Sequence, residues 1–467
     1  MTYYDVAVIG AGPAGMSAAI ESTRAGLSTI LLDEQAAPGG QIYRSVENAD
    51  SGRLDILGTD YAEGRKLAAE FRTCPALYTP GATVWNVTRD IRLAYSKEGV
   101  SHEVSAGALI VASGATERPT PLPGWTLPGV MTAGACQILL KAHGLVADDV
   151  VLVGSGPLIW LIAAQMVTAG AKPSAIVETL PRRRYIEALP KLRPNLDVMK
   201  YLKKGAAMMY AVRAAGVPVY RDARQIAIKG ETRAEAVTFV SAGRTHHLAT
   251  ETVALHQGVV PNQQITRLLH CDHEWNKSQR CFLPVLDAFG ETSVTNIYVA
   301  GDGAGIGGAR VAAMQGRLAA LRIAKKAGKP TGDGTSTLEA RLRKELSIRP
   351  FLETLYSPSI EIRKPDDRTV VCRCEEITAG QIRAAVASGV PGPNQVKSLL
   401  RTGMGPCQGR FCGLTLSEIV AECTGEEPST VGYYRIRPPL KPLRLTELAN
   451  LGATETSPAP LKQEELR

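Results

Sequence analysis

The sequence has few aromatic residues and no apolar run long enough to cross a membrane. Phe, Trp and Tyr make up 5% of its 467 residues, and the basic residues that give a net charge of +8 are not interleaved with them. This composition disfavours nucleic-acid binding and favours a basic docking face for an acidic partner. A membrane-spanning helix needs about 20 mostly apolar residues. Because an apolar strand already begins at Asp5, we expect no signal peptide and predict a cytoplasmic protein without a transmembrane segment.

Four cysteines near the C-terminus carry the most specific chemical signal. They form a C-x-C pair and a C-x4-C pair, and four glycines of the second pair's loop allow it to bend tightly around sulfide. Iron–sulfur clusters take four thiolate ligands, whereas structural zinc sites usually have spacers of about two to four residues. The pattern predicts a [2Fe-2S] cluster in which each loop holds one iron, with zinc and four unrelated buried thiols as alternatives. The ligands would be Cys372, Cys374, Cys407 and Cys412, and the glycines are Gly403, Gly405, Gly409 and Gly413.

The N-terminus has the pattern of a dinucleotide-binding fold. An apolar run, 5–9, leads into a glycine turn and then into a small-residue stretch, 16–24, that we expect to be helical. The glycines make the turn, admit a pyrophosphate and allow close packing of helix on strand. A second strand, 28–32, ends in carboxylates that can accept ribose hydroxyls. The predicted binding residues are Gly10, Gly12, Pro13, Ala14, Gly15, Asp33 and Glu34.

Three further segments indicate which dinucleotide binds. Residues 296–305 predict another strand and glycine turn before a helix over 310–324, and residues 111–115 predict a crossover strand. The first of these resembles the second flavin motif of disulfide-reductase-like flavoproteins, in which the aspartate holds the ribityl chain. The resemblance implies FAD; the alternative is a glycine-rich turn before an ordinary packing helix. The predicted FAD residues in these segments are Ala112, Gly114, Gly301 and Asp302, and a glycine turn at 39–44 adds Gly40 and Gln41.

A second dinucleotide pattern lies between these flavin segments. Residues 150–159 repeat the strand, turn and helix, and a strand at 175–178 ends in an acidic residue. Gly154, Gly156 and Glu178 are the candidate nucleotide residues, but Ile159 takes the place of the third glycine. An NAD(P) site, an adenine-nucleotide site and a relic fold without ligand all remain open.

Disulfide reductases of this fold use a cysteine pair beside the flavin. The first 330 residues contain no C-x-x-C or C-x4-C pair. Isolated cysteines are more often small buried apolar groups than redox groups. We therefore assign no catalytic residue to this chain.

Composition shifts suggest the domain limits, and the expected fold class is α/β. We expect a discontinuous FAD-binding domain at 1–120 and 255–330, and an inserted second dinucleotide-binding-like domain at 121–254. A helical linker, 331–367, then leads to a small, mainly helical [2Fe-2S] domain at 368–425. The tail, 426–467, is rich in proline, so we expect it to be extended, with 452–467 disordered.

Both ends of the chain resemble known families. The segment 372–423 resembles the [2Fe-2S] domain of bacterioferritin-associated ferredoxin (BFD), although that protein spaces its second pair C-x2-C. Nearly the whole chain resembles the α (A) subunit of heteromeric flavin-dependent amino-acid dehydrogenases, including the opine oxidases, the D-hydroxyproline and L-proline dehydrogenases, and more distantly sarcosine oxidase and hydrogen cyanide synthase. The matching segments are 39–44, 122–130, 258–262, 280–281 and the Gly-Tyr-Tyr-Arg-Ile-Arg-Pro-Pro run at 432–439.

This resemblance implies an electron-transferring FAD/[2Fe-2S] subunit of an oxidoreductase acting on CH–NH groups. A separate catalytic β subunit with its own flavin, FAD or an FMN at the interface, would oxidise the C–N bond of an opine, hydroxyproline or proline. Electrons would pass through this chain to an acceptor other than NAD, and a small γ subunit can be present. Two alternatives are an NAD(P)H-dependent flavin/iron–sulfur reductase and a non-enzymatic, cluster-carrying scaffold subunit.

Overall fold

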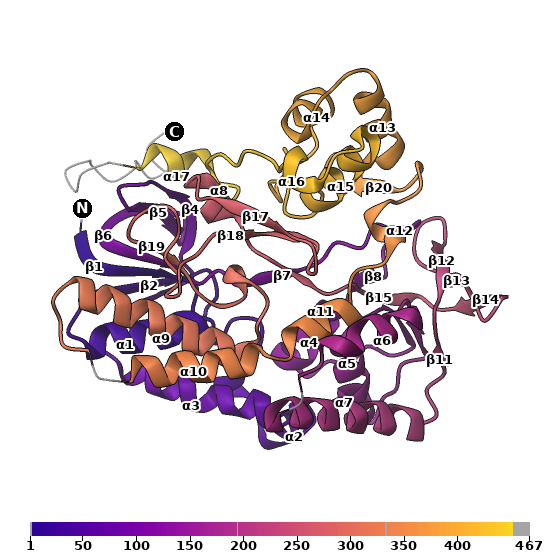
Figure 1. Ribbon diagram of the computed structural model, residues 1–467, viewed down its shortest axis with the longest axis horizontal. Helices are drawn as coiled ribbons and strands as arrows, with labels where there is room; N and C mark the ends of the chain where they lie inside the picture. The colour runs from indigo at the N-terminus through magenta and orange to yellow at the C-terminus, as the bar shows by residue number, and fades with distance from the viewer. Residues whose placement is uncertain (1, 194, 332–333, 452–467) are drawn as a thin grey trace, which may run out of the picture.

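The computed structural model describes residues 2–193, 195–331 and 334–451 (Figure 1). The chain begins in an α/β domain whose sheet has the order β3-β2-β1-β6-β5-β4, with β19 paired to β6. The central strands are parallel and apolar on both faces, as expected of a sheet covered by helices. The strands are β1 (Thr2–Ile9), β2 (Thr29–Asp33), β3 (Leu77–Pro80), β4 (Thr83–Val87), β5 (Arg92–Lys97), β6 (Val100–Val111) and β19 (Ile297–Val299).

Helices α1 (Pro13–Arg24) and α9 (Ala309–Lys326) pack side by side on this sheet (Figure 1). A Cβ atom at Gly316 would lie 2.0 Å from the carbonyl oxygen of Ala14, so glycine is needed where the two helices touch. The helices bring two segments that are distant in the sequence to the same end of the sheet. Helices α2 (Ser51–Leu57) and α3 (Thr59–Thr73) complete this layer.

The inserted region forms a second parallel sheet of order β11-β10-β9-β15-β8. Its strands are nearly continuous apolar runs, and α5 packs against them through Ile159, Ile162 and Met166. An antiparallel sheet, β12 (Arg224–Lys229), β13 (Ala236–Ser241) and β14 (Arg244–Ala249), extends from it. The other elements are β8 (Val130–Thr132), α4 (Ala133–His143), β9 (Val150–Gly154), α5 (Pro157–Thr168), β10 (Ala175–Glu178), α6 (Arg183–Ala188), α7 (Leu196–Ala214), β11 (Val219–Tyr220) and β15 (Thr252–His256).

The chain then returns to the first domain through short elements. β7 (Ala115–Glu117) pairs with β16 (Val259–Pro261), and these two strands connect the two sheets. After α8 (Gln264–Leu268), the hairpin of β17 (His273–Asn276) and β18 (Cys281–Pro284) reaches toward the C-terminal domain (Figure 1).

The described part of the expected helical linker, 331–367, is helical but does not form one continuous helix. It contains the helices α10 (Thr335–Leu346) and α11 (Arg349–Leu355). Pro350 lies in the first turn of α11, where backbone N–H groups have no acceptor within the helix, so the missing N–H of proline costs no hydrogen bond. In the interior of a continued α10, the same proline would remove a backbone hydrogen bond. After α12 (Ile360–Arg363), a small domain follows with β20 (Val370–Cys372), β21 (Ile377–Thr378), α13 (Ala379–Ala387), α14 (Pro393–Leu400) and α15 (Gly413–Thr424).

The tail is mostly extended, as its prolines predict, but it also contains two short helices, α16 (Pro428–Val431) and α17 (Leu445–Ala449). It runs from the small domain back to the first domain, where the Leu440 N–H donates to the Trp85 carbonyl and Lys441 pairs with Glu34. The expectation of disorder at 452–467 lies outside the described residues. Within the described ranges, no helix is long and apolar enough to span a bilayer.

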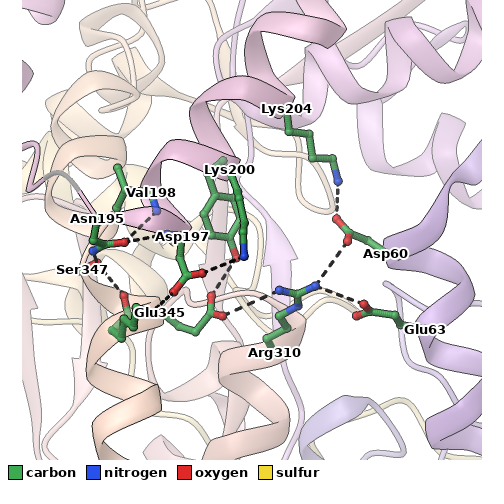
Figure 2. A network of polar contacts seen from close by, with 12 residues as sticks. Asp60, Glu63, Asn195, Asp197, Val198, Lys200, Lys204, Arg310, Glu345 and Ser347 are labelled. Atoms are coloured by element: carbon green, nitrogen blue, oxygen red, sulfur yellow. Dashed lines mark hydrogen bonds and ion pairs between the residues drawn. The ribbon is translucent and has the colours of Figure 1, made fainter.

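A surface network of charges connects α3, α7, α9 and α10 (Figure 2). Arg310 of α9 lies between Glu63 at 3.2 Å and Glu345 at 3.9 Å, and the Asp60 carboxylate also accepts from Lys204. These side chains are largely exposed, so each pair stabilises the fold by no more than about 1 kcal/mol. The network orients the linker helix against both dinucleotide folds.

A buried cluster of charges holds the small domain against the first domain. The Glu418 carboxylate of α15 accepts hydrogen bonds from Arg280, between β17 and β18, and from Arg363 of α12, each at 2.6 Å. Arg118 is buried nearby and donates to the backbone carbonyls of Gln279 and Arg280. Burial lowers the pKa of Arg118 from its usual value. Glu418 is 5% exposed, so its charge depends on these partners.

We expect Glu418→Ala to loosen the small domain, because two guanidinium groups would lose their buried partner. The expected loss of local stability is about 3–5 kcal/mol. Hydrogen exchange of the α15 amides measures this opening free energy directly. Glu422→Ala on the same helix is the matched control: its partners Lys364 and Arg383 are partly exposed, so a loss below about 1 kcal/mol is expected. Equal losses in both variants would contradict the assigned role of Glu418.

Candidate functional site

The first glycine turn lies at the carboxyl end of β1, where the sheet meets α1. A Cβ at Gly10 would lie 2.5 Å from the Ala112 oxygen, and one at Gly15 would lie 1.8 Å from the Gly10 oxygen. Gly12 is different, because its nearest neighbour would be the Gly40 Cα at 3.9 Å. The backbone beside Gly12 therefore borders open space at the N-terminus of α1. That space suits a pyrophosphate, because free N–H groups and the helix dipole favour an anion there.

The two carboxylates predicted to bind ribose, Asp33 and Glu34, have different surroundings in the structure. Asp33 is buried beneath the turn and accepts from the backbone N–H of Ala11 at 2.6 Å and of Gln35 at 2.8 Å. Burial raises the pKa of Asp33, while these two N–H groups oppose the shift. Glu34 points instead to the tail, where it pairs with Lys441. Asp33 is thus the carboxylate that the fold holds beside the dinucleotide turn.

The second predicted turn, Gly39–Gly40, packs directly on the first. The Gly39 N–H donates to the Ala11 carbonyl at 2.8 Å, and a Cβ at Gly40 would lie 2.9 Å from the Gly12 Cα. The next residue, Gln41, is exposed, and its carbonyl accepts from Lys141 of α4. These contacts close one side of the space beside Gly12.

The remaining flavin residues meet at the carboxyl ends of β6 and β19. The Gly114 carbonyl accepts from the Asn262 N–H, and a Cβ at Gly303 would lie 3.5 Å from the same oxygen. Gly301 follows β19 with a φ of +79°, so its turn favours glycine. One carboxylate oxygen of Asp302 accepts from the N–H groups of Gly307 and Gly308, and its second oxygen has no intramolecular partner among the described residues. This arrangement fits FAD, with Asp302 able to bind a hydroxyl.

The four predicted cluster cysteines come together. Cys372 interacts with Cys412 and Cys374 with Cys407, since each thiol shifts the pKa of its neighbour from the other loop. The expectation that each loop supplies both ligands of one iron stays a prediction. The spacing of two loops along the chain does not determine which cysteines face each other across them.

The two cysteine pairs lie in different environments. Cys372 and Cys412 are each 1% exposed, whereas Cys374 is exposed and Cys407 half-buried. The pKa of Cys372 is lowered to about 6, first by the Cys412 thiol and then by backbone N–H groups, including that of Gly403. A thiolate, rather than a thiol, is the metal-binding form. Two buried and two more accessible thiols, with N–H donors on the buried side, fit a cluster that has one edge toward solvent.

Within the described ranges, no three His, Cys, Asp or Glu side chains surround a single ion position, so the cysteines meet in twos rather than around one ion. The cluster site also has an aromatic part, which the cysteine spacing does not indicate. Tyr433 and Tyr434 of the tail pack into the second cysteine loop, and the Tyr434 hydroxyl lies 3.5 Å from the Cys412 Sγ. A Tyr-Tyr pair in a chain with 5% aromatics was the available signal.

The second dinucleotide turn is formed, but protein atoms cover it. Gly154 and Gly156 have φ angles of +138° and +130°, and both are buried. A Cβ at Gly156 would lie 3.1 Å from the His256 ring, which contacts the Glu117 carboxylate at 2.5 Å. Glu178 is also buried; its carboxylate accepts from the Trp160 indole, and burial raises its pKa. The groups predicted to bind the second nucleotide therefore already have protein neighbours, and the presence of a nucleotide there stays a prediction.

Comparisons with known proteins agree with both cofactor sites. Residues 4–316 match the family model of pyridine nucleotide-disulphide oxidoreductases, and residues 370–422 match that of the BFD-like [2Fe-2S] binding domain. The chain is 43% identical to the A subunit of the opine oxidase of Agrobacterium tumefaciens, over 97% of this chain and 92% of that protein. The chain belongs to the family of opine oxidase A subunits. The predicted membership, the α/β fold class and the cofactors FAD and [2Fe-2S] are thereby confirmed.

A more distant relative and a solved structure also match nearly the whole chain. The HcnB subunit of the hydrogen cyanide synthase of Pseudomonas aeruginosa is 30% identical, over 95% of this chain and 98% of that protein. Among solved structures, L-proline dehydrogenase from P. horikoshii superposes with a TM-score of 0.71 at 19% identity, over 96% of this chain and 79% of that chain. At that identity the likeness shows a shared fold.

We expect Gly12→Val to remove FAD while leaving the fold intact. The added Cβ meets protein only at ordinary contact distance, so the lost space is that of the pyrophosphate. Flavin absorbance per chain measures binding, and circular dichroism checks folding. Gly205→Val on α7 is the control, because a Cβ there meets no atom within 4 Å. Full flavin content in folded Gly12→Val protein would contradict the assigned site.

Proposed function

We propose that this chain is the electron-transferring FAD/[2Fe-2S] α subunit of a cytoplasmic, heteromeric dehydrogenase that acts on the CH–NH group of an opine or a related secondary amine. The observation that carries the proposal is the group of four cysteines, Cys372, Cys374, Cys407 and Cys412, placed against a flavin fold without a cysteine pair of its own. The relative at 43% identity is named as the A subunit of an opine oxidase, and this name supports the substrate class and the heteromeric assembly.

Each cofactor would be held by residues already described. Gly12, Asp33, Gly114 and Asp302 would bind FAD, and the four cysteines would bind the cluster. When bound, the flavin exchanges electrons in pairs or singly, and the cluster exchanges one at a time. The residues of this chain bind these groups and fix their orientation.

The interface between the two cofactor domains argues against substrate oxidation at the FAD of this chain. A small pocket beside the crossover strand β7 is lined by Thr116, Pro261 and Asn262 on one side and by Leu414 and Tyr433 on the other. The cluster domain and the tail therefore lie against the FAD-binding domain beside β7. The Gln264 amide also donates to the Gln408 carbonyl across this interface at 2.8 Å. This packing supports amine oxidation in a partner β subunit that carries its own flavin.

The covered second dinucleotide turn supports electron entry from the partner rather than from NAD(P)H. The His256 ring lies against Gly156, and Glu178 is engaged by Trp160. An NAD(P)H-dependent reductase would need this turn to admit a pyrophosphate. The proposal therefore expects slow or no bleaching of the flavin by NADH or NADPH, whereas the reductase alternative expects rapid bleaching without any partner.

The purified chain alone should not oxidise octopine, nopaline, hydroxyproline, proline or sarcosine, and activity should appear when the catalytic β subunit is added. The reason is that the substrate-binding groups would belong to the other chain. Dye reduction measures turnover, and the control reaction contains only the β subunit. Robust turnover by this chain alone would refute the division of labour.

The intact protein should contain two irons and two acid-labile sulfides per chain and give an EPR signal after one-electron reduction. Replacing any of the four cysteines with serine should destroy or weaken that signal. Cys423→Ser is the control, because this cysteine lies on the exposed side of α15, outside both loops. Stoichiometric zinc without sulfide in freshly purified protein would show that the four cysteines form a structural site. Full dye reduction by a cluster-free variant would instead favour the scaffold alternative.

A further inference from the structure

The tail completes the wall of the cluster site with an aromatic side chain. Tyr434 is 2% exposed, and its ring lies over the loop between Gly403 and Gly409. A Cβ at either glycine would come within 2.7 Å of a ring atom, which is closer than real contacts allow. These glycines therefore provide room for the ring as well as freedom for the loop. A residue well beyond Cys412 in the sequence is thus part of the cage around the cysteines.

The Tyr434 hydroxyl is aimed at one ligand atom. It lies 3.5 Å from the Sγ of Cys412, the most deeply buried position of the second loop. A cysteine that binds metal does so as a thiolate and has no proton to donate. The phenol O–H must then be the donor of this hydrogen bond.

The neighbouring Tyr433 holds this geometry without touching a ligand. Its hydroxyl donates to the Gly409 carbonyl at 3.1 Å, and the Arg267 guanidinium lies 4.4 Å from its ring centroid. The Asn394 carboxamide oxygen accepts from the Arg435 N–H at 2.8 Å. The tail is thus fixed on both sides of Tyr434, and the direction of its hydroxyl is set by packing.

We propose that Tyr434 tunes the [2Fe-2S] cluster: its hydroxyl donates a hydrogen bond to the Cys412 sulfur and raises the reduction potential of the cluster. Reduction adds one electron and makes the cluster more negative, and a donor to a ligand sulfur stabilises the more negative state. No bond to Tyr434 is made or broken, and its proton stays on the phenol. Tyr434 is a positioning residue that acts through Cys412, and this inference rests on the cluster ligands proposed above.

The test is an EPR-monitored redox titration of Tyr434→Phe in the full chain, assembled with its partner subunits. This variant keeps the ring that fills the loop and removes only the hydroxyl. We expect unchanged iron and sulfide content and a midpoint potential more negative than that of the wild type. Tyr433→Phe is the matched control: it loses a hydroxyl that binds a backbone carbonyl rather than a ligand, so its potential should stay at the wild-type value.

A second variant should shift the reduction potential of the cluster in the opposite direction. A fluorinated tyrosine introduced at position 434 has a more acidic phenol and donates a stronger hydrogen bond, so the potential should become more positive. A purely structural role of the ring would not produce opposite shifts in the two variants.

Three results would overturn the proposal, and they are distinguishable from one another. An unchanged potential in Tyr434→Phe with full iron and sulfide, or the same shift in both Tyr→Phe variants, would remove the tuning role and leave the cluster assignment intact. Absence of iron and sulfide from the wild-type protein would remove both.

Discussion

The arrangement of the two cofactor domains depends on one buried carboxylate. Glu418 accepts from Arg280 of the first domain and from Arg363 of the linker, and an unpaired charge at this depth would be costly. Its charge is therefore satisfied only when three segments, far apart in the sequence, meet. The shared pocket, the contact between Gln264 and the second cysteine loop, and the tail across that loop lie at the same interface between the two domains.

Much of the fold could be predicted because its signals are local. Each dinucleotide turn is encoded within about ten consecutive residues, and apolar strands with small-residue helices identify both parallel sheets. Boundaries shifted by a few residues: α9 runs from Ala309 to Lys326 rather than over 310–324, and α1 already begins at Pro13. The break before α11 was missed because Pro350 in a first helical turn and a proline that ends a helix look alike in a sequence.

The remaining features of the site depend on contacts between distant segments. The C-x-C and C-x4-C spacings identify the cysteines but not that Cys372 faces Cys412 and Cys374 faces Cys407. The glycines of the second loop suggested a tight bend, whereas two of them also make room for Tyr434, a residue of the tail. Ile159 indicated a weakened second fingerprint, but the covering His256 ring comes from β15, a neighbouring strand that is distant in the sequence. Contacts between segments that are distant in the sequence leave no pattern within a short stretch of residues.

The small domain is attached at both of its ends. The linker enters through Arg363, and the tail leaves past Tyr434 to bond with Trp85 and Glu34 on the first domain. Domains joined by a single flexible linker usually move relative to each other, often on microsecond to millisecond timescales. Here the second anchor restrains the separation of the two proposed cofactor sites. Electron exchange between bound cofactors would then depend little on domain motion, and its rate would respond weakly to solvent viscosity.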